Sequence, residues 1–427
     1  MEILYVTEAS GNQYNINAIN VSNGQSVTTY KGSTATSHTL CVLNDDYIFS
    51  AAPNKALLNV FELSRKGQHP KKIVTPGVVK SLCVSNDGFF IAAGIEQNVL
   101  LWDLSSGELL CIMSRHYQEV TTLTFTYDAM YLISSGKDGI VSVWRLADMI
   151  DISKQNTNKN KEPYICWSSH ASPVSQLCSS TIGYRVYSAS LDQSVKVHDI
   201  NLGETLLTIV FNTAVVSLTV DSTDTYLYAG GYDGRIYPVN MSASAKKLRQ
   251  QTNKSINFES DDAACTSLQP LQGHTQSVTC IMCNMDCSLL ASGSMDGNVK
   301  IWDVLSAQCL RTFKQNGSVT NLLLTMTPFT LALPDHKPAL VFPKLAHSVH
   351  DGSETDKNRK MHRLDFNSPV CSYSPYNNTA NSALFKKTRT LDKSLNSDLQ
   401  IQTLKQEISI LKVENHKLYD LALNKLM

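Results

Sequence analysis

Histidine, serine and aspartate recur together in this chain in an order that suggests acyl-transfer chemistry. Three sets share the same separations: His116, Ser134 and Asp138; His170, Ser188 and Asp192; and His274, Ser292 and Asp296. In a hydrolase, such residues act as base, nucleophile and orienting acid. A catalytic triad has no reason to recur, whereas these sets return in register with a longer repeat. The recurrence therefore favours a structural hydrogen-bonding role, and no catalytic, cofactor-binding or metal-ligating residue is predicted.

The longer repeat is a strand ending made of an apolar residue, an aromatic residue or its substitute, a polar residue and an aliphatic residue. The clear copies are Leu101-Trp102-Asp103-Leu104, Val143-Trp144-Arg145-Leu146 and Ile301-Trp302-Asp303-Val304. The worn copies are Ala18-Ile19-Asn20-Val21, Val60-Phe61-Glu62-Leu63, Val197-His198-Asp199-Ile200 and Ile236-Tyr237-Pro238-Val239. Counted from the N-terminus, the first four copies lie about 41 residues apart, which is the length of one four-stranded WD-repeat blade.

The segments between these endings resemble WD-repeat blades in their strands and turns. Alternating apolar and polar residues are separated by Asp-Gly turns, as expected for antiparallel strands. In WD-repeat blades, the histidine, the serine and the turn aspartate form a hydrogen-bonded tetrad with the tryptophan. Trp144 completes the set of His116, and Trp302 completes the set of His274. His198 stands where the third set would have its tryptophan.

The sequence predicts an all-β fold, a seven-bladed WD-repeat β-propeller closed by strands from both ends. Residues 1–30 give three strands and no inner one, whereas 318–324 echo the inner strand at 277–283. Pairing of 318–324 with the strand at 3–7 would close the ring and remove exposed sheet edges.

Composition divides the chain into three parts. Residues 1–347 are expected to form the propeller, 348–390 a polar linker and 391–427 a C-terminal coiled-coil helix. Polar insertions interrupt the repeat at 148–163 and 242–270. Both lack the apolar content needed for packing, so we expect mobile surface loops. Whether they also become ordered on a partner is left open.

The C-terminal segment has apolar residues at alternating spacings of three and four, which is a heptad pattern. Its predicted dimerisation residues are Ile401, Leu404, Ile408, Leu411, Asn415 and Leu418. β-Branched residues at a with leucine at d favour a parallel two-stranded coil, and one asparagine at a sets the register. We expect a homodimer; the alternative is an amphipathic helix that docks on another protein or on its own propeller.

Charge and cysteine content limit the functional classes. The chain has 37 basic and 37 acidic residues, so no strong field for polyanions is expected. No signal peptide is predicted, and the longest apolar stretch, 322–333, is too short to span a membrane. The 11 scattered cysteines indicate reduced thiols of an intracellular protein. Cys280 and Cys283 are expected on opposite sheet faces, which argues against a zinc site with Cys287.

Three further segments carry a resemblance to one family over nearly the whole chain. They are Ser114-Arg115-His116-Tyr117-Gln118, Ser190-Leu191-Asp192-Gln193-Ser194-Val195-Lys196, and the proline-interrupted stretch from Pro328 to Phe342-Pro343. With the asparagine of the heptad pattern, they resemble the family of WD repeat-containing protein eighteen, the WD-repeat subunit of the rixosome. The chain departs from the family pattern in its 242–270 insertion and at His198.

The resemblance implies a non-catalytic scaffold for large ribosomal subunit maturation and processing of the second internal transcribed spacer. Implied partners are Rix-type or PELP-type and TEX-type helical-repeat subunits and the pre-ribosomal large subunit, with direct RNA contact left open. The implied locations are the nucleus, nucleolus and nucleoplasm, with the cytoplasm left open.

The sequence argues against two other functions. The first is a substrate receptor of a cullin-type ubiquitin ligase, whose members often carry arginine two residues after Trp-Asp. Here Trp102-Asp103 precedes Leu104-Ser105, and Trp302-Asp303 precedes Val304-Leu305. The second is an enzyme, for which the sequence shows neither a ring of polar channel residues nor a glycine-rich phosphate loop.

Overall fold

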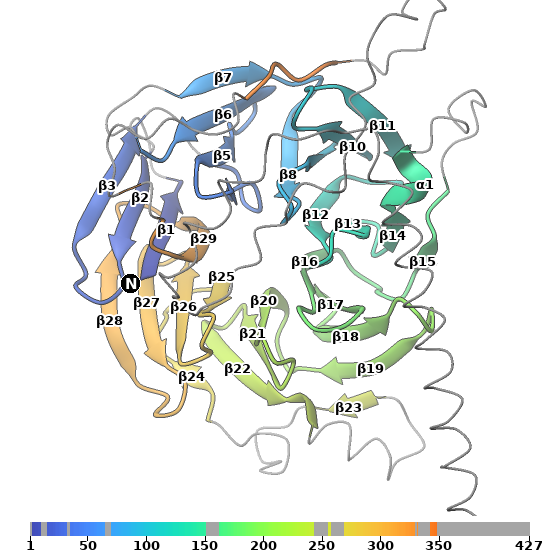
Figure 1. The fold of residues 1–427 in the computed structure, drawn as a ribbon. Helices are drawn as coiled ribbons and strands as arrows, with labels where there is room; N and C mark the ends of the chain where they lie inside the picture. The colour runs from blue at the N-terminus through green and yellow to red at the C-terminus, as the bar shows by residue number, and fades with distance from the viewer. Residues whose placement is uncertain are drawn as a thin grey trace, which may run out of the picture. The chain divides into compact units, whose positions relative to one another are not determined.

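The computed structural model describes residues 2–9, 15–31, 35–64, 70–150, 162–242, 255–257, 269–328, 331 and 342–347. These residues form seven sheets that surround a common centre, as Figure 1 shows. The sheets are called blades 1 to 7 in chain order, counting the blade that holds the N-terminal strand as blade 1. The seven-bladed propeller expected from the repeat is therefore confirmed.

Each blade runs from its innermost strand to its outermost. Blade 1 contains β29 (Val319–Met326), β1 (Glu2–Glu8), β2 (Asn15–Asn20) and β3 (Ser26–Lys31). Blade 2 contains β4 (Cys41–Leu43), β5 (Tyr47–Ala51), β6 (Leu57–Glu62) and β7 (Lys71–Val74). Blade 3 contains β8 (Val79–Val84), β9 (Phe90–Ile95), β10 (Asn98–Asp103) and β11 (Leu109–Ser114). Blade 4 contains β12 (Val120–Phe125), β13 (Tyr131–Gly136), β14 (Val141–Arg145) and β15 (Ile165–Trp167), with the helix α1 (Leu146–Ile150) after β14.

The remaining blades follow the same order. Blade 5 contains β16 (Val174–Ser179), β17 (Arg185–Ser190), β18 (Ser194–Asp199), β19 (Thr205–Val210) and β23 (Ser255–Asn257). Blade 6 contains β20 (Val215–Val220), β21 (Tyr226–Gly231), β22 (Arg235–Asn240) and β24 (Leu271–Gln272). Blade 7 contains β25 (Val278–Cys283), β26 (Leu289–Ser294), β27 (Asn298–Asp303) and β28 (Cys309–Lys314).

Blade 1 is built from both ends of the chain. β1 pairs antiparallel with β29, in a register that sets Leu4 opposite Leu324 and Val6 opposite Leu322. The hydroxyl groups of Thr7 and Thr320 also form a hydrogen bond between the two strands, with their oxygens 2.8 Å apart. The pairing gives β29 a hydrogen-bonded partner on its outer edge. A strand left there without a partner would expose backbone N–H and C=O groups at a sheet edge.

The core is divided among the spaces between neighbouring blades. Both faces of each sheet are apolar because each face packs on a different neighbour, and the second strands, such as β5, β9 and β13, are buried along nearly their whole length, whereas the outermost strands β3, β7 and β28 are largely exposed. Seven hydrophobic clusters occur in the described residues, one at each blade–blade contact. Cluster residues come from both blades at each contact; Trp144 of blade 4, for example, packs with Leu101 of blade 3.

The repeated strand ending lies on the third strand of each blade, but one copy was aligned wrongly. In blade 4, the N–H of the closing residue Leu146 donates to a carbonyl just before the second strand, and Met241 makes the equivalent bond in blade 6. Val239 therefore occupies the tryptophan position, and the match of Tyr237 within 236–239 is two residues out of register. A four-residue pattern is too degenerate to place a strand that has lost its tryptophan.

The two insertions were expected to be mobile loops throughout, and the structure differs in part. Met149 of α1, at the start of the 148–163 insertion, is buried against the contact between blades 3 and 4. β23, inside the 242–270 insertion, pairs parallel with β19 and widens blade 5 to five strands. The sequence analysis missed β23 because three residues leave no periodic signal. The other insertion residues, 151–161, 243–254 and 258–268, lie outside the described residues.

The contact pattern divides the chain into one unit from Met1 to Gly352 and a second from Ser353 to Met427. The expected linker and C-terminal helix lie outside the described residues. Within the part that the structure describes, no helix has the length and apolar character needed to cross a bilayer.

Candidate functional site

The histidine, serine, aspartate and tryptophan of blade 4 are brought together into one hydrogen-bonded set. His116 Nδ1 lies 3.2 Å from Asp138 Oδ2, and its Nε2 lies 2.8 Å from Ser134 Oγ. Trp144 Nε1 donates to the same Ser134 Oγ at 2.9 Å. The aspartate also accepts the backbone N–H of Tyr117 at 3.0 Å. The set therefore ties the third strand, the second strand and the loop before the first strand to one another.

Burial and hydrogen bonding act in opposite directions on Asp138. Burial alone would raise the pKa of this carboxyl. The hydrogen bond and charge of His116, with backbone N–H groups that include Ile140, outweigh burial and lower the pKa. Asp138 is therefore held as a carboxylate that only accepts hydrogen bonds.

Blade 7 repeats this arrangement. His274 Nδ1 lies 3.1 Å from Asp296 Oδ2, and its Nε2 lies 2.7 Å from Ser292 Oγ. Trp302 Nε1 donates to Ser292 Oγ at 2.8 Å. Burial is the largest influence on His274 and lowers its pKa, against the attraction of Asp296. The imidazole is therefore held in its neutral form.

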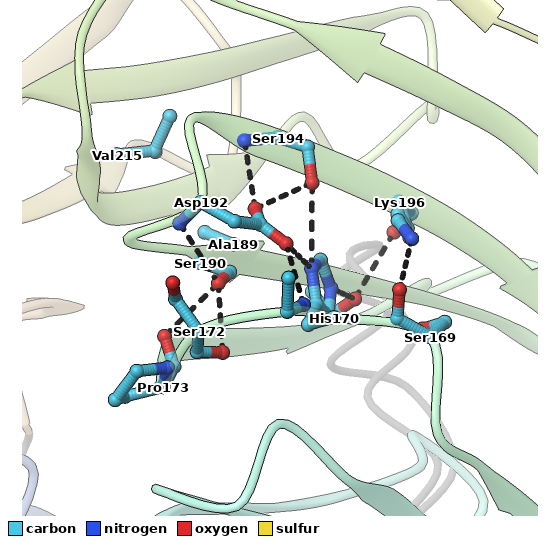
Figure 2. A network of polar contacts seen from close by, with 12 residues as sticks. Ser169, His170, Ser172, Pro173, Ala189, Ser190, Asp192, Ser194, Lys196 and Val215 are labelled. Atoms are coloured by element: carbon cyan, nitrogen blue, oxygen red, sulfur yellow. Dashed lines mark hydrogen bonds and ion pairs between the residues drawn. The ribbon is translucent and has the colours of Figure 1, made fainter.

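Blade 5 keeps the hydrogen bonds although its tryptophan is replaced. His170 Nδ1 lies 3.0 Å from Asp192 Oδ2, as Figure 2 shows. The Nε2 of His170 lies 2.8 Å from Ser188 Oγ. His198 Nε2 lies 3.1 Å from the same Ser188 Oγ and so takes the place of the indole N–H. Burial, followed by the charges of His170 and Lys196, lowers the pKa of His198 to about 3. A neutral imidazole thus replaces the indole.

A neighbouring tryptophan supplies the bulk that the smaller imidazole lacks. The rings of Trp167 and His198 stack, with centroids 4.5 Å apart and an interplanar angle of 17°. Trp167 Nε1 donates to the carbonyl oxygen of Gly203 at 2.8 Å. His198 Nδ1 lies 3.0 Å from Thr205 Oγ1, so both imidazole nitrogens have partners. His198 is visible in the sequence as a departure from the motif, but no local pattern links it to Trp167, which compensates for it.

The serines are placed where no substrate reaches them. Ser134, Ser188 and Ser292 are each 0% exposed. In blades 4 and 7 the hydroxyl oxygen already accepts the indole N–H, so attack on a carbonyl would require the blade to open. A nucleophile needs access to its substrate and a free lone pair. The geometry therefore supports a structural role for these sets.

Trp102 of blade 3 uses a different partner. Ala92 stands where blades 4, 5 and 7 have the serine, so no hydroxyl is available. Trp102 Nε1 instead donates to the carbonyl oxygen of Ala346 at 2.8 Å, and the Ala346 N–H donates to Gly107 at 2.8 Å. The described segment 342–347, which we call the strap, thus returns from beyond β29 to blade 3. Sequence reasoning missed this contact, although a tryptophan without its serine was a signal.

The strap is held by apolar packing as well. The ring of Phe342 meets those of Tyr47 and Phe49 at centroid distances of 6.2 and 5.1 Å. Gly107 has a φ of +75°, and a Cβ there would lie 2.3 Å from the carbonyl oxygen of Lys344. Glycine is therefore required for the close approach of the strap.

Two of the three cysteines that resembled a zinc site, Cys280 and Cys283, are held as thiols. Burial raises the pKa of Cys280 and of Cys283 to about 12. Cys287 forms hydrogen bonds with Asp221 and with Ser222. Metal ligation requires the thiolate, which these surroundings disfavour. No group of three or more metal-ligating side chains occurs among the residues that the structure describes.

The predicted dimerisation residues cannot be placed. Ile401, Leu404, Ile408, Leu411, Asn415 and Leu418 lie outside the described residues.

The fold and the tetrads define a WD-repeat β-propeller. The model of the "WD domain, G-beta repeat" matches residues 107–145, 161–199 and 265–303. A likeness of fold alone links the chain to the crystal structure of the computationally designed Ika8 protein. That likeness has a TM-score of 0.51 and 21% identity, and it covers 74% of this chain and 88% of the other.

Sequence relatives narrow the class of WD-repeat propellers to one family. WD repeat-containing protein 18 of Danio rerio is 33% identical, over 99% of this chain and 97% of its own length. The pre-rRNA-processing protein pro-1 of Caenorhabditis elegans is 25% identical over 75% of this chain and 60% of its own. The pre-rRNA-processing protein crb3/ipi3 of Schizosaccharomyces pombe is 26% identical over 73% of this chain and 74% of its own length. The chain belongs to the WD repeat-containing protein 18 family.

Proposed function

We propose that this chain is a non-catalytic scaffold subunit of a nuclear and nucleolar complex that matures the large ribosomal subunit. One observation carries the proposal: the chain matches its family over nearly its whole length, and relatives in two other organisms are named pre-rRNA-processing proteins. Within that pathway, we assign the chain to the processing of the second internal transcribed spacer, and we assign the nuclease and kinase activities to other subunits.

The geometry supports a scaffold rather than an enzyme. The three histidine-containing sets connect strands inside single blades, and their serines are buried. Closure of blade 1 places the N-terminal strand β1 and the last described strand, β29, in one sheet. A closed ring of sheets presents loops at both ends from a rigid body, which suits the binding of several partners.

The proposed partners are helical-repeat subunits of the Rix or PELP type and the TEX type, together with the pre-ribosomal large subunit. Direct RNA binding is left out of the proposal because acidic and basic residues balance at 37 each. A second copy of the chain, joined through the C-terminal heptads, would double the number of binding sites and so raise the avidity for a two-fold partner.

The alternative function, a substrate receptor of a ubiquitin ligase, is not favoured. The relatives with informative names are pre-rRNA-processing proteins. The residue two positions after each Trp-Asp pair is Ser105 or Leu305 rather than arginine.

The test is depletion of the protein in its own cells, followed by Northern analysis with probes on either side of the second internal spacer. We expect large-subunit precursors that retain this spacer to accumulate while small-subunit maturation continues, and full-length protein to restore processing. Normal processing of the spacer after complete depletion would reject the proposed function.

A further inference from the structure

One end of the propeller carries the turns that join the first and second strands of blades 2 to 7. From blade 3 to blade 7, consecutive turns are hydrogen-bonded to each other. Asn86 Nδ2 donates to the carbonyl oxygen of Tyr127 at 3.1 Å, Thr181 Oγ1 to that of Ser222 at 2.6 Å, and Ser222 Oγ to that of Met285 at 3.3 Å. The turns therefore form a connected surface whose shape is set before any partner binds, which lowers the entropic cost of association.

This surface is acidic although the chain as a whole is neutral. The six turns are residues 43–46, 85–89, 126–130, 180–184, 221–225 and 284–288. Their acidic residues are Asp45, Asp46, Asp87, Asp128, Asp221, Asp224 and Asp286, and the turns contain neither lysine nor arginine. The opposite end carries both signs, as in the pair of Lys137 and Glu119 at 2.7 Å.

Blades 3 and 4 add exposed apolar side chains to this charge. The two turns have the same local pattern: an aspartate, a residue with positive φ and a large apolar residue. They read Asp87-Gly88-Phe89 and Asp128-Ala129-Met130, with φ of +72° at Gly88 and +53° at Ala129. Phe89, Tyr127 and Met130 are 46%, 63% and 52% exposed. We call Asp87, Phe89, Tyr127, Asp128 and Met130 the blade 3–4 rim.

The two carboxylates of the rim influence each other. Burial raises the pKa of Asp87, and the nearby charge of Asp128 raises it further. Asp128 is kept ionised, because hydrogen bonds from Thr126, Met130 and Tyr184 outweigh burial and lower its pKa. Tyr184 Oη donates to Asp128 Oδ2 at 3.0 Å and so fixes the carboxylate. A cation placed between Asp87 and Asp128 would relieve their repulsion.

We propose that the blade 3–4 rim binds a protein segment in which lysine or arginine alternates with apolar side chains. The cationic group lies between the carboxylates of Asp87 and Asp128, and the ring of Tyr127 supplies an aromatic face for it. Phe89 and Met130 cover the apolar side chains of the segment. The phosphates of a nucleic acid would meet two carboxylates here, so the surface favours a basic protein segment over RNA. The inference does not depend on the proposed role in ribosome maturation.

The test uses the full chain and a fluorescein-labelled peptide of lysine, arginine and leucine in alternation, followed by fluorescence anisotropy. A peptide with glutamate in place of the basic residues and a single-stranded RNA are run in parallel. The rim variants are Asp87→Asn with Asp128→Asn, and Phe89→Ala with Tyr127→Ala. The control variant, Glu96→Gln with Tyr117→Ala, changes two side chains as well, and it removes one charge and one exposed ring at the opposite end of the same two blades.

We expect the basic peptide to bind the parent chain and each rim variant to bind it about fivefold or more weakly. The control variant should bind like the parent, and added salt should weaken binding. Asparagine retains the acceptor oxygen of each turn, and a thermal melt checks that each variant is folded. Equal binding by parent and folded rim variants would overturn the inference. Preference for RNA, or the same loss in the control variant, would overturn it too.

Discussion

Each buried serine is the centre of a tetrad because its hydroxyl bonds to two rings at once. Ser292 Oγ accepts from Trp302 Nε1 at 2.8 Å and contacts His274 Nε2 at 2.7 Å. Removing either ring leaves a polar atom unsatisfied in the core, which adds to the loss of apolar contact. Blade 5 follows the same principle with His198, since its imidazole restores the bond to Ser188 and its stacking restores the packing.

Replacing Trp302 tests the contribution of a complete tetrad. Trp302→Ala should lower the free energy of unfolding by roughly 3–5 kcal/mol, because a large buried ring is lost and Ser292 loses a donor. Leu305 follows the same strand and is 83% exposed, so Leu305→Ala should change stability by less than about 0.5 kcal/mol. Thermal and urea melts measure both. A Trp302→Ala melt that coincides with the parent would show that the ring is not a structural centre.

Protonation of buried histidines should make the propeller sensitive to mild acid. The folded pKa of His198 is about 3, and that of His274 is lowered too, whereas an unfolded histidine titrates near about 6.5. The unfolded state therefore binds protons first. The stability that these neutral histidines contribute is fully present above about pH 6.5. It is lost as the pH falls from there toward their pKa values in the folded protein. The lowered pKa values of Asp138 and Asp296 affect the stability only below about pH 4, which is the pKa of aspartate in the unfolded chain.

His198→Gln isolates one of these groups. Glutamine keeps an amide near Ser188 but does not titrate, so the fall in Tm between pH 7 and pH 5 should be smaller than in the parent. Loss of the stacking on Trp167 should lower Tm at both pH values, and the comparison therefore uses the difference between them. His347→Gln, at an exposed position, serves as the control and should leave that difference unchanged. An unchanged difference in His198→Gln would contradict the assignment.

The strap joins distant parts of the chain although it is not a strand. It lies across the contact between blades 2 and 3, where Phe342 and Leu345 are buried with Phe49 and Trp102. Its Ala346 carbonyl supplies the acceptor that Ala92 cannot. Blade 3 therefore depends on a segment that is separated from it in the chain by the whole of blades 4 to 7.

Removing the main side chain of the strap should weaken the propeller. Phe342→Ala is expected to lower the free energy of unfolding by about 3 kcal/mol, since the ring packs on Tyr47 and Phe49. Phe89→Ala, which removes the same ring from an exposed position, should change it by less than about 0.5 kcal/mol. Urea melts compare the two. Equal effects would show that the strap contributes nothing specific.

The molecule as a whole combines a ring closed upstream with a separate C-terminal segment. β29 ends at Met326, so the sheet of blade 1 is complete before the linker begins. The heptads from Ile401 to Leu418 follow much later in the chain. Association of two chains through these heptads would therefore leave the propeller free to bind partners.

Deletion of residues 399–427 tests the dimer. The full chain should be a dimer at tens of micromolar, and the truncated chain should be a folded monomer, as measured by light scattering and a thermal melt. Asn415→Ile should tighten association while relaxing the choice of two strands, because the buried amide no longer disfavours other arrangements. A monomeric full-length chain without any partner would favour docking of this helix elsewhere.

The sequence by itself determined the propeller, its blade count and the members of its three histidine-containing sets. These features are repeated, and repetition makes weak local signals consistent: the spacing of His116, Ser134 and Asp138 recurs in blades 5 and 7. The pairing of β1 with β29 was readable for the same reason, because residues 318–324 copy an inner strand.

Only the tertiary structure decided the features that occur once. The bond from Trp102 to Ala346 joins residues 244 positions apart, and no local pattern specifies such a contact. The stacking of Trp167 on His198 and the shift of the blade 6 motif from Tyr237 to Val239 also depend on which side chains meet across strands. The acidic rim of blades 3 and 4 emerged in the same way, since its two turns are distant in sequence and adjacent only because neighbouring blades pack together.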